Sequence, residues 1–426
     1  MNRKGLFIFI GIAAVLIIVA LVIFGPGRKP PAPIPANLVF WGLESEASWR
    51  PVIQKFREKN ETITVEYTQI DPANYEQKLI NALANGTGPD IFMLKSSQIV
   101  PHASKIAPAP QGELGVSPKE YARIFADIAS ADLITPEGQI IGMPLSLDTL
   151  ALFYNKDIFN AENIAIPPRT WEEVTDLGRR LTKVAPNGDI IMSGLALGTG
   201  TNTDHAMEIL SPLMLQSGSP VVERATREVK ISRKEAREAF LFYISHTRLS
   251  DPNYSWNVRM PHSLDVFAQD RAAMAIGFLS DIDSLRKQNP HLNLGIAPFP
   301  QPADARTPLT YGRYTFPTVS KQSRVQEAAW QFLLYAASSE GAKLFLDATH
   351  RAPIHRTLIA ADTASGELDI FWRQALIARN WPIPDETTSR RLFEQAIDQT
   401  IANVTDSPTA LSRLEQQLVL LFSAKR

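Results

Sequence analysis

Cysteine is absent from the whole chain of 426 residues. This absence excludes disulfide bridges, zinc sites made of thiolates, iron–sulfur clusters and a cysteine nucleophile. It also excludes attachment to a membrane through a lipid-modified cysteine. Neither a redox-active thiol nor a cysteine-held metal can therefore explain what the protein does.

The chain also lacks an excess of charge of either sign. Its 43 Lys and Arg residues nearly cancel its 44 Asp and Glu residues, and no long basic run occurs. Proteins that bind nucleic acid need clustered positive charge to contact phosphates, so we expect no nucleic-acid partner. The hydrophobic share of 45% and the charged share of 20% are typical of a globular protein, and the length suggests two domains.

Sequence motifs of catalytic and metal sites are missing as well. The seven histidines form no His-Glu-x-x-His motif and no i, i+4 pair. No Gly-x-Ser-x-Gly motif occurs, and the Gly-rich stretch from Gly198 lacks the Lys-Ser/Thr ending of a phosphate-binding loop. We therefore predict that the protein is not an enzyme and has no catalytic residues, metal or cofactor. The carboxylate pair of a glycoside hydrolase has no fixed spacing in sequence, so a carbohydrate lyase or hydrolase is the alternative.

The longest hydrophobic run lies at the N-terminus. It is uncharged from Leu6 to Phe24 and follows Arg3 and Lys4. A helix of this length would span roughly 28 Å, about the thickness of a bilayer's hydrocarbon core. The run exceeds the ~7–15 apolar residues of a typical signal peptide, so we predict an uncleaved membrane anchor, with cleavage as the alternative. A proline-rich, stiff linker follows to residue 36.

From Leu38 onward, short apolar runs alternate with amphipathic segments. Thr170 and Glu173 have the spacing of a capping box and open one of the predicted helices. Alternation of this kind predicts an α/β fold around a parallel or mixed sheet. Strands are predicted over 38–42, 63–70, 90–94, 150–156, 190–199, 272–279 and 292–300, and helices over 46–60, 75–86, 167–184, 203–218, 324–338 and most of the chain from 368.

Three loops that follow predicted strands carry polar residues able to contact a ligand. Open α/β sheets bind their ligands at the carboxyl ends of strands, which is where these loops lie. The residues are Glu44, Ser45, Lys95, Ser97, Gln98 and Asn202. Each loop also has a simpler interpretation, because such residues often cap a helix or face solvent.

Asp148 stands in the middle of a largely apolar, strand-like run over residues 142–159. A carboxylate buried in a strand without a partner is costly, so something must compensate its charge. Three roles are open: a catalytic acid, one half of a structural ion pair, or a hydrogen-bond acceptor for a ligand.

The aromatic residues fall into two groups. Trp49, Trp330 and Trp372 lie on predicted helix faces and are expected in the core. Aromatic residues in loops or at strand ends can stack on the C–H faces of a polyhydroxylated ligand, although any one of them can also be ordinary packing. These are Trp41, Tyr254, Trp256, Phe278, Tyr311, Tyr314 and Trp381.

Several motifs follow one another from residue 38 to the C-terminus. They are LVFWGLES, ANGTGPDIFML, GMPLSLDTLALFYNKDIF, PPRTWEEV, FAQDRAAMAIGFLSDI and GRYTFPTVSKQSRVQEAAWQFLLYAASSEGAKLF. In their order and spacing they resemble the extracellular solute-binding proteins of ABC importers, in the carbohydrate-type group that includes the maltose-binding protein family. Each motif alone is weak, whereas the ordered set covers nearly the whole globular part.

The resemblance implies a two-lobed, type II periplasmic-binding-protein-like fold with hinge crossings between the lobes, preceded here by the transmembrane helix. The crossings would fall near Asp148, near Tyr314 to Thr318 and near Ala352 to His355. One lobe would hold residues 37–147 plus 316–352, and the other 148–315 plus 353–426, after the anchor and linker of 1–36. Ligand would be clamped in the cleft between the lobes.

The resemblance further implies a monomer, held extracytoplasmically at the cell membrane, that captures a carbohydrate and delivers it to the permease subunits of an ABC importer. A sensor or adhesion module with the same cleft is a further alternative. The ligand-facing residues would be those of the three polar loops together with Asp148, Phe278, Arg313 and Trp381. Arg313 stands where the family has a glycine, and its guanidinium allows an acidic sugar as ligand.

Overall fold

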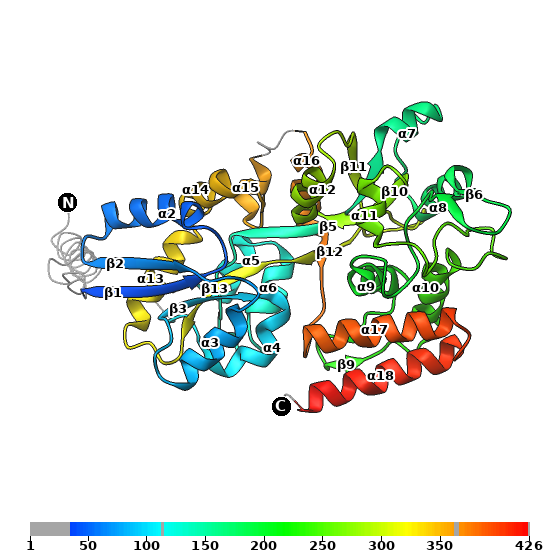
Figure 1. Ribbon diagram of the computed structural model, residues 1–426. Helices are drawn as coiled ribbons and strands as arrows, with labels where there is room; N and C mark the ends of the chain where they lie inside the picture. Colours follow the sequence, from blue (N-terminus) through cyan, green and yellow to red (C-terminus); the bar gives the residue numbers. More distant parts are fainter. Residues whose placement is uncertain (1–34, 112–114, 362–365, 425–426) are drawn as a thin grey trace, which may run out of the picture.

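The computed structural model describes residues 35–111, 115–361 and 366–424. The chain forms two lobes, each with a β-sheet flanked by helices, and β5 and β12 run where the lobes meet (Figure 1). The predicted two-lobed α/β fold is therefore confirmed. The predicted anchor at 6–24 lies outside the described residues, and no helix within the described ranges is long and apolar enough to cross a bilayer.

The first lobe contains a five-stranded sheet in the order β2-β1-β3-β13-β4. Strand β1 is parallel to β2 and β3, and β13 is antiparallel to β3. Four of the five residues of β3 are buried, as expected for a central strand with helices on both faces. The strands are β1 (Ala36–Gly42), β2 (Ile63–Gln69), β3 (Ile91–Lys95), β4 (Ile106–Ala107) and β13 (Thr315–Ser320). The helices are α2 (Glu46–Lys59), α3 (Tyr75–Ala84), α4 (Ile99–His102), α5 (Pro118–Ile124), α6 (Asp127–Leu133), α13 (Gln326–Ala336), α14 (Ser339–Thr349) and α15 (Arg356–Ala360), with the 3-10 turns η1 (Ser96–Gln98) and η2 (Ala103–Lys105).

The second lobe is organised around the ten-residue strand β5, which pairs with β10, β11, β12 and β14. Its strands are β5 (Ser146–Asn155), β10 (Met274–Phe278), β11 (Leu294–Pro298), β12 (Thr310–Arg313), β14 (Ala352–Pro353) and β15 (Ala378–Arg379), and two hairpins consist of β6 (Lys183–Val184) with β7 (Ile190–Met192) and β8 (Val222–Glu223) with β9 (Glu228–Val229). Its helices are α7 (Lys156–Ala161), α8 (Trp171–Leu181), α9 (Ala206–Gln216), α10 (Lys234–Ser245), α11 (Ser263–Ala268), α12 (Ile282–Gln288), α16 (Leu368–Gln374), α17 (Glu386–Ile401) and α18 (Ser407–Ala424), with η3 (Leu279–Asp281) and η4 (Ala375–Ile377).

Aromatic packing holds helix α2 on the first sheet. The Trp49 ring lies 4.7 Å from that of Phe40 and 5.0 Å from that of Phe345, measured between centroids. Trp49 is fully buried and Trp330 is 1% exposed, which confirms both as core residues. Burial of one large apolar side chain contributes about 1.5–3 kcal/mol to stability. The cluster therefore holds α2 against the sheet, together with the loop of Glu44 and Ser45 that precedes this helix.

Most predicted elements are present, and one differs in kind. The capping box is confirmed, because the Glu173 N–H donates to Thr170 Oγ1 at 3.2 Å and the Thr170 N–H donates to Glu173 Oε2 at 3.2 Å. The strand predicted over 190–199 is wrong beyond Met192. Gly194 lies so close to the backbone of α8 that a Cβ would meet the Gly178 carbonyl at 1.9 Å, and the chain turns away instead of extending.

Three segments run between the two sheets side by side. Strand β12 of the second sheet continues through Tyr314 into β13 of the first, β5 begins beside this link, and β14 pairs with the start of β5. The predicted lobe boundaries stay a prediction; Ile354 and Ile359, just after β14, pack in the core cluster of the first sheet.

A buried histidine makes the stability of the second lobe depend on pH. His246 is 1% exposed, its Nδ1 lies 3.2 Å from the Tyr243 carbonyl oxygen, and burial lowers its pKa from 6.5 to about 4. Between pH 6.5 and 4 the unfolded chain therefore binds a proton at this histidine that the folded protein does not bind. The free energy of unfolding is for this reason highest above pH 6.5 and falls as the pH drops towards 4.

We expect His246→Asn to remove a pH-dependent loss of unfolding free energy on the order of 3 kcal/mol between pH 6.5 and 4. Urea unfolding across this range measures it, with the exposed His291→Asn as the control. An identical pH slope in wild type and His246→Asn would contradict this assignment.

Candidate ligand-binding site

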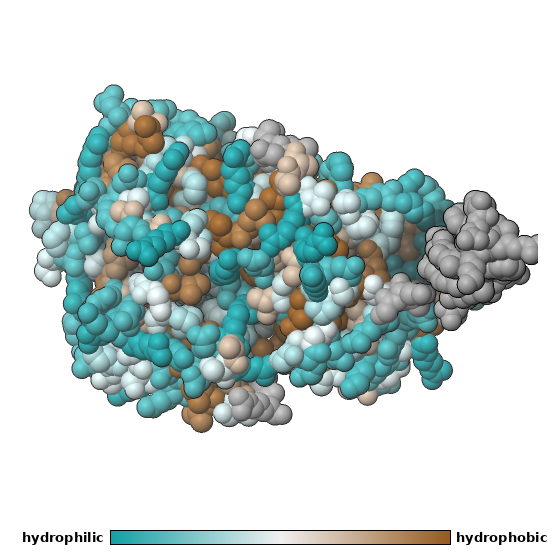
Figure 2. All heavy atoms as spheres, turned by 180° about the vertical axis from the view of Figure 1, so that it is seen from behind, coloured by the Kyte–Doolittle hydropathy of each residue, from teal (hydrophilic) through white to brown (hydrophobic). Residues whose placement is uncertain are grey.

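A cleft of about 1300 Å³ lies between the two lobes and is lined by residues of both. It is larger than most sites for small molecules, which occupy roughly 300–1,000 Å³. On the face opposite to that of Figure 1, hydrophilic residues cover most of the surface and hydrophobic ones show between them (Figure 2). Six of the predicted ligand-facing residues line the cleft: Glu44, Ser45, Lys95, Ser97, Asp148 and Arg313.

Asp148 and Arg313 form an ion pair on the floor of the cleft. The two residues stand opposite each other on the antiparallel strands β5 and β12. Arg313 Nε lies 3.2 Å from Asp148 Oδ2, and Ser280 Oγ donates to the same oxygen at 2.7 Å. Of the three roles open for Asp148, the ion pair is therefore present. The carboxylate is still 20% exposed in the cleft, so a ligand can also reach it.

The Arg313 guanidinium is held from two further sides. Its Nη2 donates to Ser280 Oγ at 2.9 Å, and its carbon lies 3.6 Å from the centroid of the Phe278 ring. A cation stacked on an aromatic face and paired with a carboxylate is fixed in position. Arg313 therefore contributes to the shape of the cleft floor, and its positive charge is already paired with Asp148.

Glu44 lines the cleft and has one carboxylate oxygen without a hydrogen-bond partner among the described residues. Its Oε1 accepts from Arg351 Nη1 at 2.9 Å and from Thr315 Oγ1 at 3.2 Å. Its Oε2 is buried and has no hydrogen-bond partner among the described residues, and the whole residue is only 7% exposed. A buried carboxylate oxygen without a donor is destabilising by about 1–3 kcal/mol, so a donor from a ligand would relieve this cost.

Ser97 and Lys95 of the first lobe contact Glu386 of the second lobe across the cleft. Ser97 Oγ, just after β3, donates to Glu386 Oε2 at 2.6 Å, and Lys95 Nζ lies 3.8 Å from the same oxygen. Glu386 begins helix α17 of the second lobe and also pairs with Arg390 at 3.3 Å. Burial alone would raise the pKa of Glu386, but Lys95, Ser97 and Arg390 together hold it below its usual value. The carboxylate therefore stays charged and can bridge the lobes.

Every Lys and Arg that lines the cleft is paired with an acid that also lines it. The pairs are Lys95–Glu386, Arg286–Glu367, Arg313–Asp148 and Arg351–Glu44. Two further acids line the cleft. Glu208 pairs with Arg390 at 2.7 Å, and no ion pair of Asp283 is seen among the described residues. The cleft therefore offers carboxylate acceptors and no spare Lys or Arg.

Four predicted ligand-facing residues do not line the cleft. Gln98 caps η1 by accepting from the Lys95 N–H at 3.0 Å. Asn202 donates to the Met260 carbonyl at 2.6 Å, and Trp381 donates to Ser211 Oγ at 3.0 Å. Phe278 is fully buried beneath Arg313. These side chains hold the surrounding structure in place.

Most of the aromatic residues predicted in loops or at strand ends are buried in the core. Trp256 is fully buried and Trp381 is 5% exposed, in contrast to the expectation that they stack on a ligand. Only Tyr311 and Tyr314 of the loop and strand-end aromatics line the described part of the cleft. Tyr314 donates to Asp132 at 2.8 Å, and burial raises the pKa of both tyrosines well above the usual value, so they stay neutral.

Sequence reasoning missed Glu386, Arg351, Ser280 and Thr315. Glu386 and Arg351 look like ordinary ends of helices in the sequence, and only the contact across the fold reveals them. Ser280 had a usable signal, because it follows the predicted strand over 272–279. Within the described residues, no group of three or more His, Cys, Asp or Glu is placed to hold a metal ion.

Comparisons with known proteins place the chain in a family. A binding protein from Brucella abortus is 22% identical over 332 residues, covering 76% of this chain and 77% of the relative. A cyclo/maltodextrin-binding protein solved with maltotetraose superposes with a TM-score of 0.75 at 16% identity, covering 93% of this chain and 98% of that one. The cyclic α-maltosyl-1,6-maltose-binding protein of Arthrobacter globiformis gives 0.75 at 18% identity, with coverages of 92% and 100%.

Both solved structures are named as binding proteins. The family model also describes binding proteins, which agrees with the predicted non-enzymatic role. The family model of bacterial extracellular solute-binding proteins matches residues 41–343, well over half of the chain. The resemblance found in the sequence motifs is therefore confirmed, and the chain belongs to the bacterial extracellular solute-binding protein family.

Proposed function

We propose that the protein captures a neutral, polyhydroxylated solute, with carbohydrate as its class, in the interlobe cleft and delivers it to an ABC importer. The observation that carries the proposal is the buried Glu44 Oε2, which has no hydrogen-bond partner among the described residues, in a cleft whose described Lys and Arg side chains are all paired. A ligand hydroxyl is the donor that fits such an oxygen. Structural neighbours named for binding cyclo/maltodextrin and cyclic α-maltosyl-1,6-maltose support the same ligand class.

An acidic sugar fits this cleft poorly, although the sequence allowed one because of Arg313. The guanidinium of Arg313 already contacts Asp148, Ser280 and the Phe278 ring. A ligand carboxylate on Arg313 would have to share that one cation with Asp148, and the two negative charges would repel each other in the partly buried floor, which is unfavourable. The cleft therefore favours hydroxyl donors over anions.

Closure of the lobes would be stabilised by contacts made to both of them. Glu44, Ser45 and Lys95 belong to the first lobe, and Asp148 and Ser280 face them from the second sheet and its turn. A sugar that bridges these groups binds the closed state better than the open one, and this difference in affinity drives closure.

The proposal includes a tether at the N-terminus. The apolar run over 6–24 is long enough for a bilayer, and no cysteine exists to carry a lipid. A segment of this kind, followed by a proline-rich linker, would keep the binding lobes beside the importer.

A ligand screen tests the sugar class. We expect maltose, maltotetraose or other neutral oligosaccharides to raise the unfolding temperature, whereas glucuronic and galacturonic acid leave it unchanged. A ligand at 100 times its Kd stabilises the folded protein by about 2.7 kcal/mol, which a thermal-shift assay resolves. Stabilisation by uronic acids alone would contradict the neutral-ligand proposal, and conversion of a sugar to products would favour the enzyme alternative.

Asp148→Ala tests the floor of the cleft. Loss of a charged acceptor typically costs about 1.5–3 kcal/mol, so calorimetry with the sugar found in the screen should show an affinity at least roughly 10-fold weaker. The matched control is Asp347→Ala, an exposed acid on α14 that pairs with Lys343 outside the cleft. Equal affinity in wild type and Asp148→Ala, with both proteins folded, would remove Asp148 from the binding site.

Glu386→Ala tests the bridge across the cleft. Because the chain has no cysteine, spin labels can be placed uniquely at the exposed positions Ala73 and Gln395, one in each lobe. Without the Glu386 carboxylate, the sugar-free lobes should separate, and pulsed electron paramagnetic resonance should record a longer mean distance.

The control for this experiment is Glu340→Ala, which breaks an ion pair with Lys59 inside the first lobe. It should leave the distance between the labels unchanged. A distance that is the same in wild type and Glu386→Ala would show that the bridge does not restrain the lobes.

Membrane fractionation of the full-length protein tests the tether. We expect the protein in the membrane fraction with an intact N-terminus, and a variant that begins at residue 35 in the soluble fraction. Recovery of the full-length protein as a soluble form with a shortened N-terminus would support the cleaved-signal alternative instead.

A further inference from the structure

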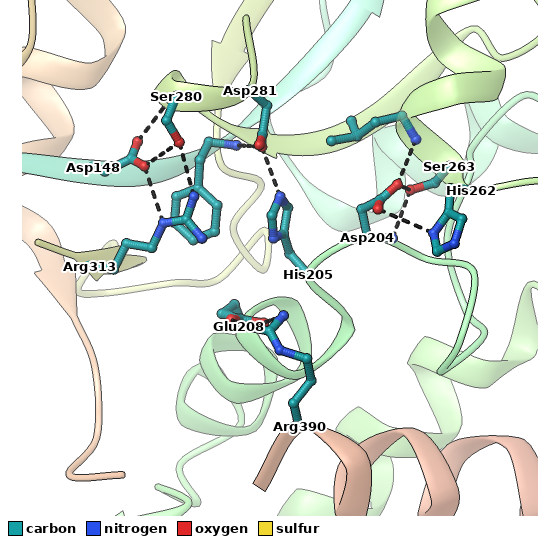
Figure 3. A network of polar contacts seen from close by, with 12 residues as sticks. Asp148, Asp204, His205, Glu208, His262, Ser263, Ser280, Asp281, Arg313 and Arg390 are labelled. Atoms are coloured by element: carbon teal, nitrogen blue, oxygen red, sulfur yellow. Dashed lines mark hydrogen bonds and ion pairs between the residues drawn. The ribbon is translucent and has the colours of Figure 1, made fainter. Parts of the chain in front are cut away.

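A chain of contacts connects the cleft floor with two residues behind it (Figure 3). His205 Nε2 lies 2.8 Å from Asp281 Oδ2, and the Phe278 N–H donates to that same oxygen at 2.7 Å. Asp281 closes the turn η3, whose Ser280 donates to Asp148 at 2.7 Å and accepts from Arg313 at 2.9 Å. The turn is therefore hydrogen-bonded to both members of the ion pair.

The Phe278 ring makes a second connection between the same groups. Arg313 covers one face of the ring, with its guanidinium carbon 3.6 Å from the centroid. The His205 ring meets Phe278 edge-on, at 4.8 Å between centroids and 83° between planes. A shift of His205 would therefore displace Arg313 through two sets of contacts, those of the Phe278 ring and those of the turn η3.

His205 has a strained backbone that its neighbours must maintain. It precedes α9 with φ of +61°, in the left-handed region that a non-glycine residue enters at a cost of about 1–3 kcal/mol. Its side chain is 14% exposed and that of Asp281 is 18% exposed. Backbone strain that surrounding contacts hold in place, here the part-buried His205–Asp281 hydrogen bond, is often found at functional sites.

The charge state of Asp281 suits this arrangement. Burial would raise the pKa of its carboxyl, but His205, the Phe278 N–H and the nearby Arg313 together hold that pKa below its usual value. The carboxylate therefore stays ionised and accepts both hydrogen bonds on one oxygen.

We infer that His205 and Asp281 are positioning residues for ligand binding, which fix the Ser280 turn and through it the orientation of the Asp148–Arg313 pair. They line a separate cavity of about 370 Å³ rather than the cleft, so they act on a bound sugar through the floor and not by contact. The inference rests on the proposed function, because it takes the floor as the surface that the sugar meets.

The test uses a readout that needs no ligand. The Arg313 Nε–H donates to Asp148 beside an aromatic face, so its proton should exchange slowly with water and its NMR signal should be shifted by the ring. The signal is identified in the full chain by its loss in Arg313→Lys. In His205→Asn, where asparagine tolerates the left-handed backbone, the exchange should be at least threefold faster. His205→Gln, whose amide can donate to Asp281, should restore slow exchange.

Controls separate positioning from a general loss of stability. His262→Asn removes an exposed histidine 3.4 Å from Asp204 in the same cavity and should leave the Arg313 signal unchanged. Asp281→Asn is the second variant, should His205→Asn not fold. Unchanged Arg313 exchange in a folded His205→Asn or Asp281→Asn protein would overturn the inference.

A calorimetric arm with maltotetraose extends the test to binding. His205→Asn should weaken binding at least threefold in wild type and have no further effect in a Ser280→Ala background, because both changes act through one turn. Additive losses would contradict action through Ser280. Failure of maltotetraose to bind wild type would count against the proposed ligand class, and the NMR result would still decide the positioning roles.

Discussion

The ion pair between Asp148 and Arg313 joins the two strands on which the cleft floor is built. Its partners stand opposite each other on β5 and β12, and β12 leads directly into β13 of the other lobe. Both side chains are partly exposed, so the pair adds little to stability by itself. Its importance is geometric: it fixes a carboxylate and a cation where the two sheets meet.

Other polar groups of the cleft add hydrogen-bond acceptors to this floor. Because Arg313 is already neutralised, the floor presents acceptor oxygens, and Glu44 adds another from the first lobe. The Ser97–Glu386 bridge joins the lobes across the same cleft. A sugar that donates hydroxyls to Glu44 and Asp148 would replace part of the water in the cleft and hold the lobes from both sides. Sugar binding and closure of the lobes would therefore be linked in one equilibrium.

Much of the fold could be predicted from the sequence, because periodicity and capping are local. The Thr170–Glu173 capping box and the strand at 38–42 are examples. The site could be predicted only in part. Sequence places Phe278 and Trp381 at strand ends or in loops but cannot tell a stacking platform from a buried ring. Arg351 contacts Glu44 across 307 residues, a pairing that no local pattern encodes.

A crystal structure of the protein with the neutral sugar that stabilises it most would show directly what the cleft binds. We expect the sugar in the interlobe cleft, with one hydroxyl within hydrogen-bond distance of Glu44 Oε2 and another at Asp148, and the Asp148–Arg313 pair intact. A sugar bound elsewhere, or an acidic ligand whose carboxylate takes the place of Asp148 on Arg313, would contradict this expectation.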